Sequence, residues 1–112
     1  MYVRLTRERV ARVGFCYGTE WPDWLKTDFS LGKSIPKRPF RSLTIRITIL
    51  DEEGREIGVL EGKSFCNPVD QFCKRDARKY AMRRLFSQNR EVGLLSLSDC
   101  HILSPVLLNG HK

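Results

Sequence analysis

The clearest structural signal in this chain is the stretch 65–86, which reads FCNPVDQFCKRDARKYAMRRLF. Asn67 and Pro68, with Asp70 three residues after Asn67, are typical of the first turn of a helix. Apolar residues then recur every three or four positions, namely Val69, Phe72, Cys73, Ala77, Tyr80, Ala81 and Leu85. This spacing places them on one side of a helix. The stretch therefore predicts an amphipathic central helix over residues 67–88.

Basic residues are concentrated in the same stretch. They are Lys74, Arg75, Arg78, Lys79, Arg83 and Arg84. Within residues 74–84 only Asp76 opposes them, and Arg84 falls within the predicted apolar side, where a purely structural residue would be apolar. Arginine forms paired hydrogen bonds with phosphate, and lysine supplies a compact charge. We therefore predict that these six residues bind an anion. The alternative is a solvated helix surface without a ligand.

Residues 43–66, before the helix, predict a β-hairpin. Apolar side chains alternate with polar ones in the first half, at Leu43, Ile45, Ile47 and Ile49. Such alternation is typical of a strand with one buried face. A polar turn containing Gly54 follows, and Ile57, Val59 and Phe65 continue the returning strand. Together, the hairpin and the helix predict a small α+β domain.

The N-terminal part, residues 1–42, gives a weaker signal. Residues 1–14 fit a short helix capped by Thr6 about as well as an edge strand. Residues 15–42 are expected to be irregular, because aromatic residues are interleaved with glycine and proline. Trp21 and Trp24 in this part, together with Tyr80, are the predicted stacking residues for a nucleotide base. The alternative is that the aromatic residues close one end of the core.

The C-terminal element, residues 94–110, is predicted to form a short helix. Its end signals are Ser98 with Asp99 at the start and Asn109 with Gly110 at the finish. Pro105 would remove one hydrogen bond inside such a helix. A strand at residues 94–97 is the alternative, and residues 87–93 predict a polar connector between the two helices.

Composition favours one ordinary globular domain, residues 1–112, with 41% hydrophobic and 29% charged residues and a net charge of +7. The apolar runs are too short to span a membrane, and the N-terminus lacks the apolar segment of a signal peptide, so we expect a cytoplasmic protein. The four cysteines lack C-x-x-C spacing and only two histidines are present. Reduced thiols and no metal site are therefore expected.

Sequence motifs for catalysis are not found. Two Gly-Lys-Ser triplets, beginning at Gly32 and Gly62, lack the upstream glycine that a phosphate-binding P-loop needs. Asp99, Cys100 and His101 are adjacent, but catalytic groups are normally brought together by the fold rather than by adjacency. We therefore expect a non-enzymatic protein with no catalytic residues and no cofactor.

Residues 66–85 resemble a pattern of small phage-encoded proteins, in which Cys or His precedes Pro-x-Asp-x-Phe, a basic pair and Gly or Ala-Arg-x-x-Ala-x-x-Arg. The matching residues are Cys66, Pro68, Asp70, Phe72, Lys74, Arg75, Ala77, Arg78, Ala81 and Arg84. The nearest such family is the anti-Thoeris cyclic-nucleotide sponge type, whose members are small oligomers with an N-terminal sheet and C-terminal helices. They sequester cyclic ADP-ribose signals without cleaving them. The resemblance implies a counter-defence role in the host cell cytoplasm.

Together, these patterns predict a protein that sequesters an anionic nucleotide signal through its basic helix. One alternative is a protein-directed inhibitor of a host nucleic-acid machine, such as an anti-CRISPR protein or an RNA polymerase modulator. Another is plain nucleic-acid binding. If the chain forms a homo-oligomer, the central helix or the edge of the hairpin would supply the interface.

Overall fold

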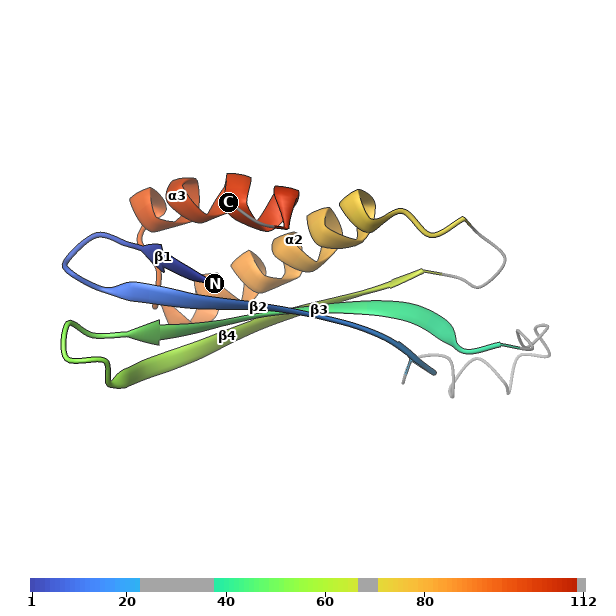
Figure 1. Cartoon of the computed structure of the whole chain (residues 1–112), viewed down its shortest axis with the longest axis horizontal. Helices are drawn as coiled ribbons and strands as arrows, with labels where there is room; N and C mark the ends of the chain where they lie inside the picture. The colour runs from blue at the N-terminus through green and yellow to red at the C-terminus, as the bar shows by residue number, and fades with distance from the viewer. Residues whose placement is uncertain (23–37, 67–70, 111–112) are drawn as a thin grey trace.

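The computed structural model describes residues 1–22, 38–66 and 71–110. Its elements in chain order are β1 (Tyr2–Arg4), β2 (Val10–Glu20), β3 (Phe40–Leu50), β4 (Glu56–Cys66), α2 (Lys74–Val92) and α3 (Leu97–Asn109). The four strands form one antiparallel sheet in chain order, and both helices lie on the same face of it (Figure 1). The predicted α+β class is confirmed, and so is the hairpin, which β3 and β4 form.

The core lies between the sheet and the two helices. Its residues without exposed surface include Leu43, Ile45, Ile47, Ile49, Leu60, Leu85, Leu103 and Leu107. Those of β3 stand at every second position, as the alternation of the sequence predicts. The opposite face of the sheet carries exposed charged residues such as Arg12 and Arg46.

β2 corrects the expectation of a long irregular segment. The strand continues through residues 15–20 and pairs with β3 along its whole length. The expectation is wrong here because Gly14 and Gly18 suggested a loop, whereas the strand is held by pairing with a distant part of the chain that no local pattern reveals. Residues 23–37, with Trp24, lie outside the described residues.

The first residues of the chain form an edge strand, not a helix. β1 pairs with the start of β2, and Thr6 lies in the turn between them instead of capping a helix. Arg7 and Glu8 at the tip of this turn both have a φ of 59°. That left-handed conformation is required at both central positions of the tightest hairpin turns.

α2 confirms that a basic helix follows the hairpin, but it begins later than predicted. The helix starts at Lys74, and residues 71–73 before it are not helical. Phe72 and Cys73 therefore precede the helix and do not belong to its apolar side. The predicted cap falls on residues 67–70, which lie outside the described residues.

The end of α2 also differs from the prediction. The helix continues to Val92 and stops at Gly93, where φ is 74°, so the polar connector predicted for residues 87–93 is wrong. Residues 87–92 belong to the helix although they are mostly polar, and one of them, Asn89, faces the interior. Its side-chain amide donates to the carbonyl of Leu95 and accepts from the N–H of the same residue.

α2 packs closely on the sheet through a row of small residues. Ala77 and Ala81 are buried, and the hydroxyl of Ser64 donates to the carbonyl of Ala77 at 2.8 Å. A Cβ added at Gly62 of β4 would collide with the carbonyl oxygen of Ala81. Tyr80, which was expected on this side, is instead 52% exposed.

α3 confirms the C-terminal helix and excludes the alternative strand. Its N-cap is Ser96 and not Ser98: the Ser96 hydroxyl accepts from the N–H of Asp99, whose carboxylate accepts from the N–H of Ser96, both at 3.2 Å. Such a reciprocal pair is a capping box. The helix includes Pro105 and ends at Gly110, where φ is 75°.

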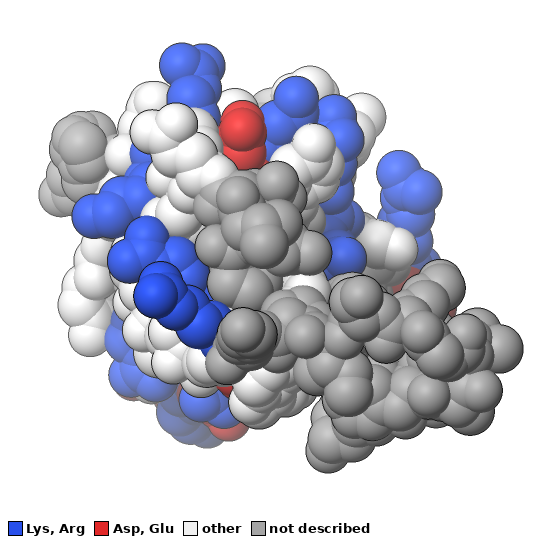
Figure 2. Space-filling view, turned by 90° about the vertical axis from the view of Figure 1, so that its right-hand side faces the viewer, with Lys and Arg blue, Asp and Glu red and all other residues white. Residues whose placement is uncertain are grey.

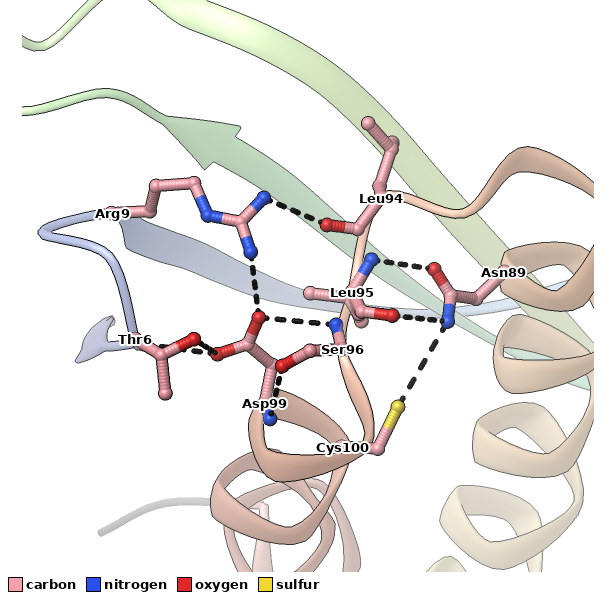
Figure 3. Close-up of polar contacts among 8 residues, drawn as sticks. All are labelled: Thr6, Arg9, Asn89, Leu94, Leu95, Ser96, Asp99 and Cys100. Atoms are coloured by element: carbon pink, nitrogen blue, oxygen red, sulfur yellow. Dashed lines mark hydrogen bonds and ion pairs between the residues drawn. The ribbon is translucent and has the colours of Figure 1, made fainter.

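A buried polar cluster fixes α3 to the turn between β1 and β2 (Figure 3). The carboxylate of Asp99 accepts from the N–H and the hydroxyl of Thr6 and forms an ion pair with Arg9 at 2.7 Å. Arg9 also donates to the carbonyl of Leu94. Burial alone would raise the pKa of Asp99, but hydrogen bonds from Thr6 and Ser96 hold that pKa below its ordinary value.

Candidate anion-binding site

The basic end of the molecule lies where α2 begins. Viewed from this end, the described surface is rich in Lys and Arg and shows little acidic surface (Figure 2). Its exposed cations are Arg41 of β3 and Lys74, Arg75 and Lys79 of α2. Within the described residues, none of these four cations forms an ion pair. The described acidic residues therefore leave the positive charge at this end uncompensated.

Two of these cations stack on two aromatic rings. The rings of Tyr17 and Phe72 meet edge to face, with centroids 6.3 Å apart. The guanidinium of Arg41 lies 5.0 Å from the ring centroid of Phe72, and the ammonium of Lys74 lies 5.3 Å from that of Tyr17. We call these four residues the cation–aromatic cluster. With Gly18, Thr19 and Ser42, they line a hollow of about 400 Å³.

Arg78 lies beside the cation–aromatic cluster and positions it. Its Nε donates to the carbonyl of Leu108 at 2.7 Å, and one Nη lies 3.4 Å from the hydroxyl of Tyr17. A Cβ added at Gly110 would lie 3.2 Å from the Cδ of the same side chain. Arg78 therefore ties the end of α3 to α2 and orients Tyr17, so its guanidinium is already partly engaged by groups of the protein.

The start of α2 favours an anion for a second reason. The first N–H groups of a helix have no partner within it and carry a partial positive charge. Cys73 at the N-cap supplies no side-chain hydrogen bond, and Lys74 and Arg75 follow it, with Asp76 as the acidic residue of the first turn. Cations are unfavourable at this position. A bound anion would offset that cost.

The other predicted anion ligands lie along the exposed side of α2. Arg75, Lys79 and Arg83 are spaced by four residues, so they form one row. The guanidinium of Arg83 lies 5.8 Å from the ring centroid of Tyr80.

Of the predicted stacking residues, Tyr80 lines a separate hollow of about 260 Å³ beside the end of β4. Tyr80 therefore does not belong to the cation–aromatic cluster. Trp21 follows β2 and is 41% exposed.

Arg84 has a structural partner that the sequence did not indicate. Its guanidinium donates to the carbonyl of Lys63 at 2.6 Å, and one turn further the Gln88 side chain accepts from the N–H of Glu61 at 2.7 Å. Both backbone groups belong to the outer edge of β4. The prediction that Arg84 interrupts the buried side of the helix is wrong, because Arg84 is exposed and covers the sheet edge.

Sequence reasoning missed two residues of the cation–aromatic cluster, Tyr17 and Arg41, and placed Phe72 inside the helix. Arg41 could have been found, because it stands at an even spacing from Leu43 and therefore shares the helix-facing side of β3. Tyr17 could not have been found in this way, because it lies in β2 and the sequence did not predict a strand there.

The site supplies positive charge and aromatic surface, and the adjacent residues Asp99, Cys100 and His101 are not among those that line its hollow. Asp99 is engaged by Arg9, His101 is exposed, and burial together with the Asp99 charge raises the pKa of the Cys100 thiol. Over residues 1–22, 38–66 and 71–110, no three potential metal ligands lie together. The arrangement can hold an anion that also carries a flat ring.

Two further findings concern the chain as a whole. In the part of the chain that the structure describes, no helix is both long enough and apolar enough to cross a membrane. No protein-family model, curated protein or solved structure matches this chain.

Proposed function

We propose that this chain is a non-enzymatic binding protein that holds a phosphate-bearing nucleotide at the cation–aromatic cluster. The observation that carries this proposal is the stacking of two cations, Arg41 and Lys74, on two aromatic rings at the start of a helix. Neither cation forms an ion pair with a described residue. The phosphates would be held by these cations and by Arg75. The base would contact the ring of Tyr17, which is 43% exposed.

The size of the site supports a small ligand. A hollow of about 400 Å³ falls within the range of small-molecule sites, roughly 300–1,000 Å³. The cluster is confined to one end of the molecule, whereas proteins that bind single-stranded nucleic acid line a longer path with charges and rings. Sequestration of a signal during counter-defence stays a prediction, because it rests on the resemblance alone.

Calorimetric titration with ADP and with inorganic phosphate tests the proposal. ADP should bind with one-to-one stoichiometry and more tightly than phosphate, because only ADP also contacts the ring. Lys74→Ala and Arg41→Ala should each weaken ADP binding about tenfold, since a hydrogen bond to a charged group contributes about 1.5–3 kcal/mol. ADP released by denaturation should be chemically intact, as expected of a protein that performs no reaction.

Arg55→Ala is the matched control. It removes the same charge at the far turn of the hairpin, where Arg55 pairs with Asp51 and Glu53. Equal weakening by Arg55→Ala and Lys74→Ala would show a general charge effect and refute the site. A labelled single-stranded DNA separates the nucleic-acid alternative, because its affinity would exceed that of ADP and fall steeply with salt.

A further inference from the structure

The outer edges of β4 and β2 differ in how far other parts of the chain occupy their backbone groups. At β4, the outward carbonyl of Lys63 and the outward N–H of Glu61 are occupied by side chains of α2. Occupied edge groups cannot pair with another strand, which is one way in which proteins protect a sheet edge. The predicted oligomer interface at this edge of the hairpin is therefore disfavoured.

Among the described residues, only the first part of the outer edge of β2 has a partner. β1 lies beside β2 (Figure 1) and pairs with its residues 10–12. Met1 exchanges hydrogen bonds with Val13. Because both backbone groups of Val13 point outward and the pairing with β3 continues without a register shift, those of Phe15, Tyr17 and Thr19 point outward too. Within the described residues, no hydrogen bond occupies them.

The side chains around this edge define what could pair with it. Tyr17 and Thr19 project to the helix side of the sheet and line the hollow that also contains Arg41 and Lys74. Glu20, the one acidic residue nearby on β2, forms an ion pair with Lys63 of β4 at 2.8 Å. A strand added at this edge would therefore place every second side chain on the side of Arg41 and Lys74, which form no ion pair with a described residue.

We propose that the outer edge of β2, from Phe15 to Thr19, docks an extended acidic segment of a partner protein by strand addition. Backbone hydrogen bonds to the outward groups of β2 supply the pairing, as in other cases of strand addition. Carboxylates at alternate positions of the segment face Lys74 and Arg41. The proposal goes beyond nucleotide binding, because the backbone groups of β2 have no part in the nucleotide site.

Hydrogen exchange in the free protein gives the first test. The amides of Phe15, Tyr17 and Thr19 should exchange rapidly, while those of Cys16 and Gly18 should be protected by pairing with β3. Protection of Tyr17 and Thr19 in the free monomer would overturn the proposal, because the edge would then already be covered by the chain itself.

Binding of a labelled eight-residue peptide that alternates Glu with Val gives the second test, measured by fluorescence anisotropy. Thr19→Pro removes one outward N–H without touching the pairing with β3, and it should weaken peptide binding about five- to tenfold. Thr19→Val keeps that N–H and should bind like the wild type. A peptide that alternates Lys with Val should not bind.

The variants separate this proposal from the nucleotide site. Thr19→Pro and Thr19→Val should bind ADP equally, because they differ in the outward N–H, which has no part in the nucleotide site, whereas Lys74→Ala should weaken both ligands. Unchanged peptide binding by Thr19→Pro, or equal binding of the Lys peptide, would overturn strand addition at β2. A dimer in sedimentation velocity that Thr19→Pro dissociates would also overturn it, because the occupant of the edge would then be a second copy of this chain.

Discussion

Asp99 links the packing of α3 to pH. Its carboxylate has no exposed surface, accepts two hydrogen bonds from Thr6 and pairs with Arg9. Because the pKa of Asp99 is lowered in the folded protein, the unfolded chain holds this proton more tightly. The stabilisation is therefore present at neutral pH and lost as the pH falls below about 4. Urea unfolding at stepwise pH should show the free energy of unfolding declining through that range.

Asp99→Asn isolates this contribution. The variant leaves the largely buried Arg9 without its counter-charge and should lower the free energy of unfolding at pH 7 by about 3–5 kcal/mol. It should also reduce the decline of stability at acid pH. Glu56→Gln, at an exposed carboxylate, should leave stability at pH 7 almost unchanged. Wild-type stability in Asp99→Asn would show that the buried ion pair is not needed.

The sequence shows which residues are basic, but it does not show which groups their side chains bind. Arg78 and Arg84 were both predicted as anion ligands, yet each donates to a backbone carbonyl of another element, at Leu108 and Lys63. Every residue has a backbone carbonyl, so the residue types in the sequence do not indicate which carbonyl accepts a given hydrogen bond. The division of the basic residues into structural and unpaired ones therefore required the fold.

The sequence predicted correctly those helices and strands whose signals lie within their own residues. The alternation along β3 gave a strand, and Gly110 marked the end of α3 through its left-handed backbone. β2 was missed because its pairing with β3 is non-local. The start of α2 was misplaced because the apolar residue Phe72 fits the helical period, although it packs against the core from outside the helix.

The contact between α2 and β4 depends on one glycine. A Cβ at Gly62 would collide with backbone atoms of Ala81 and Leu85, so the helix would have to move away from the sheet. We predict that Gly62→Ala lowers the free energy of unfolding by about 2 kcal/mol or more, within the usual cost of overpacking. Urea unfolding followed by circular dichroism measures this change.

Gly14→Ala is the control for that prediction. Gly14 also lies within a strand, but the nearest atom to an added Cβ is 4.0 Å away, on the open face of the sheet. The substitution should be neutral or should stabilise by about 0.5–1 kcal/mol, because alanine loses less backbone freedom on folding. Equal destabilisation by the two substitutions would mean that close packing is not the reason for Gly62.

On the scale of the whole molecule, folding and binding favour opposite charges at the start of α2. The helix carries seven basic and two acidic residues, with Lys74 and Arg75 at its positive end. In the free protein these cations oppose the helix dipole and repel one another. The proposed ligand needs them there. The protein should therefore be more stable, and bind more weakly, when the charge at this end is reversed.

A matched pair of charge reversals tests this opposition. Arg75→Glu and Arg90→Glu change the net charge equally, but Arg75 lies in the first turn of α2 and Arg90 in the last. Arg75→Glu should raise the free energy of unfolding by about 0.3–1 kcal/mol, and Arg90→Glu should lower it by a similar amount. ADP binding should weaken for Arg75→Glu alone, because Arg90 lies at the far end of the helix. If both reversals stabilise the protein equally, general repulsion explains the effect; if both weaken ADP binding equally, the ligand is not held at the start of α2.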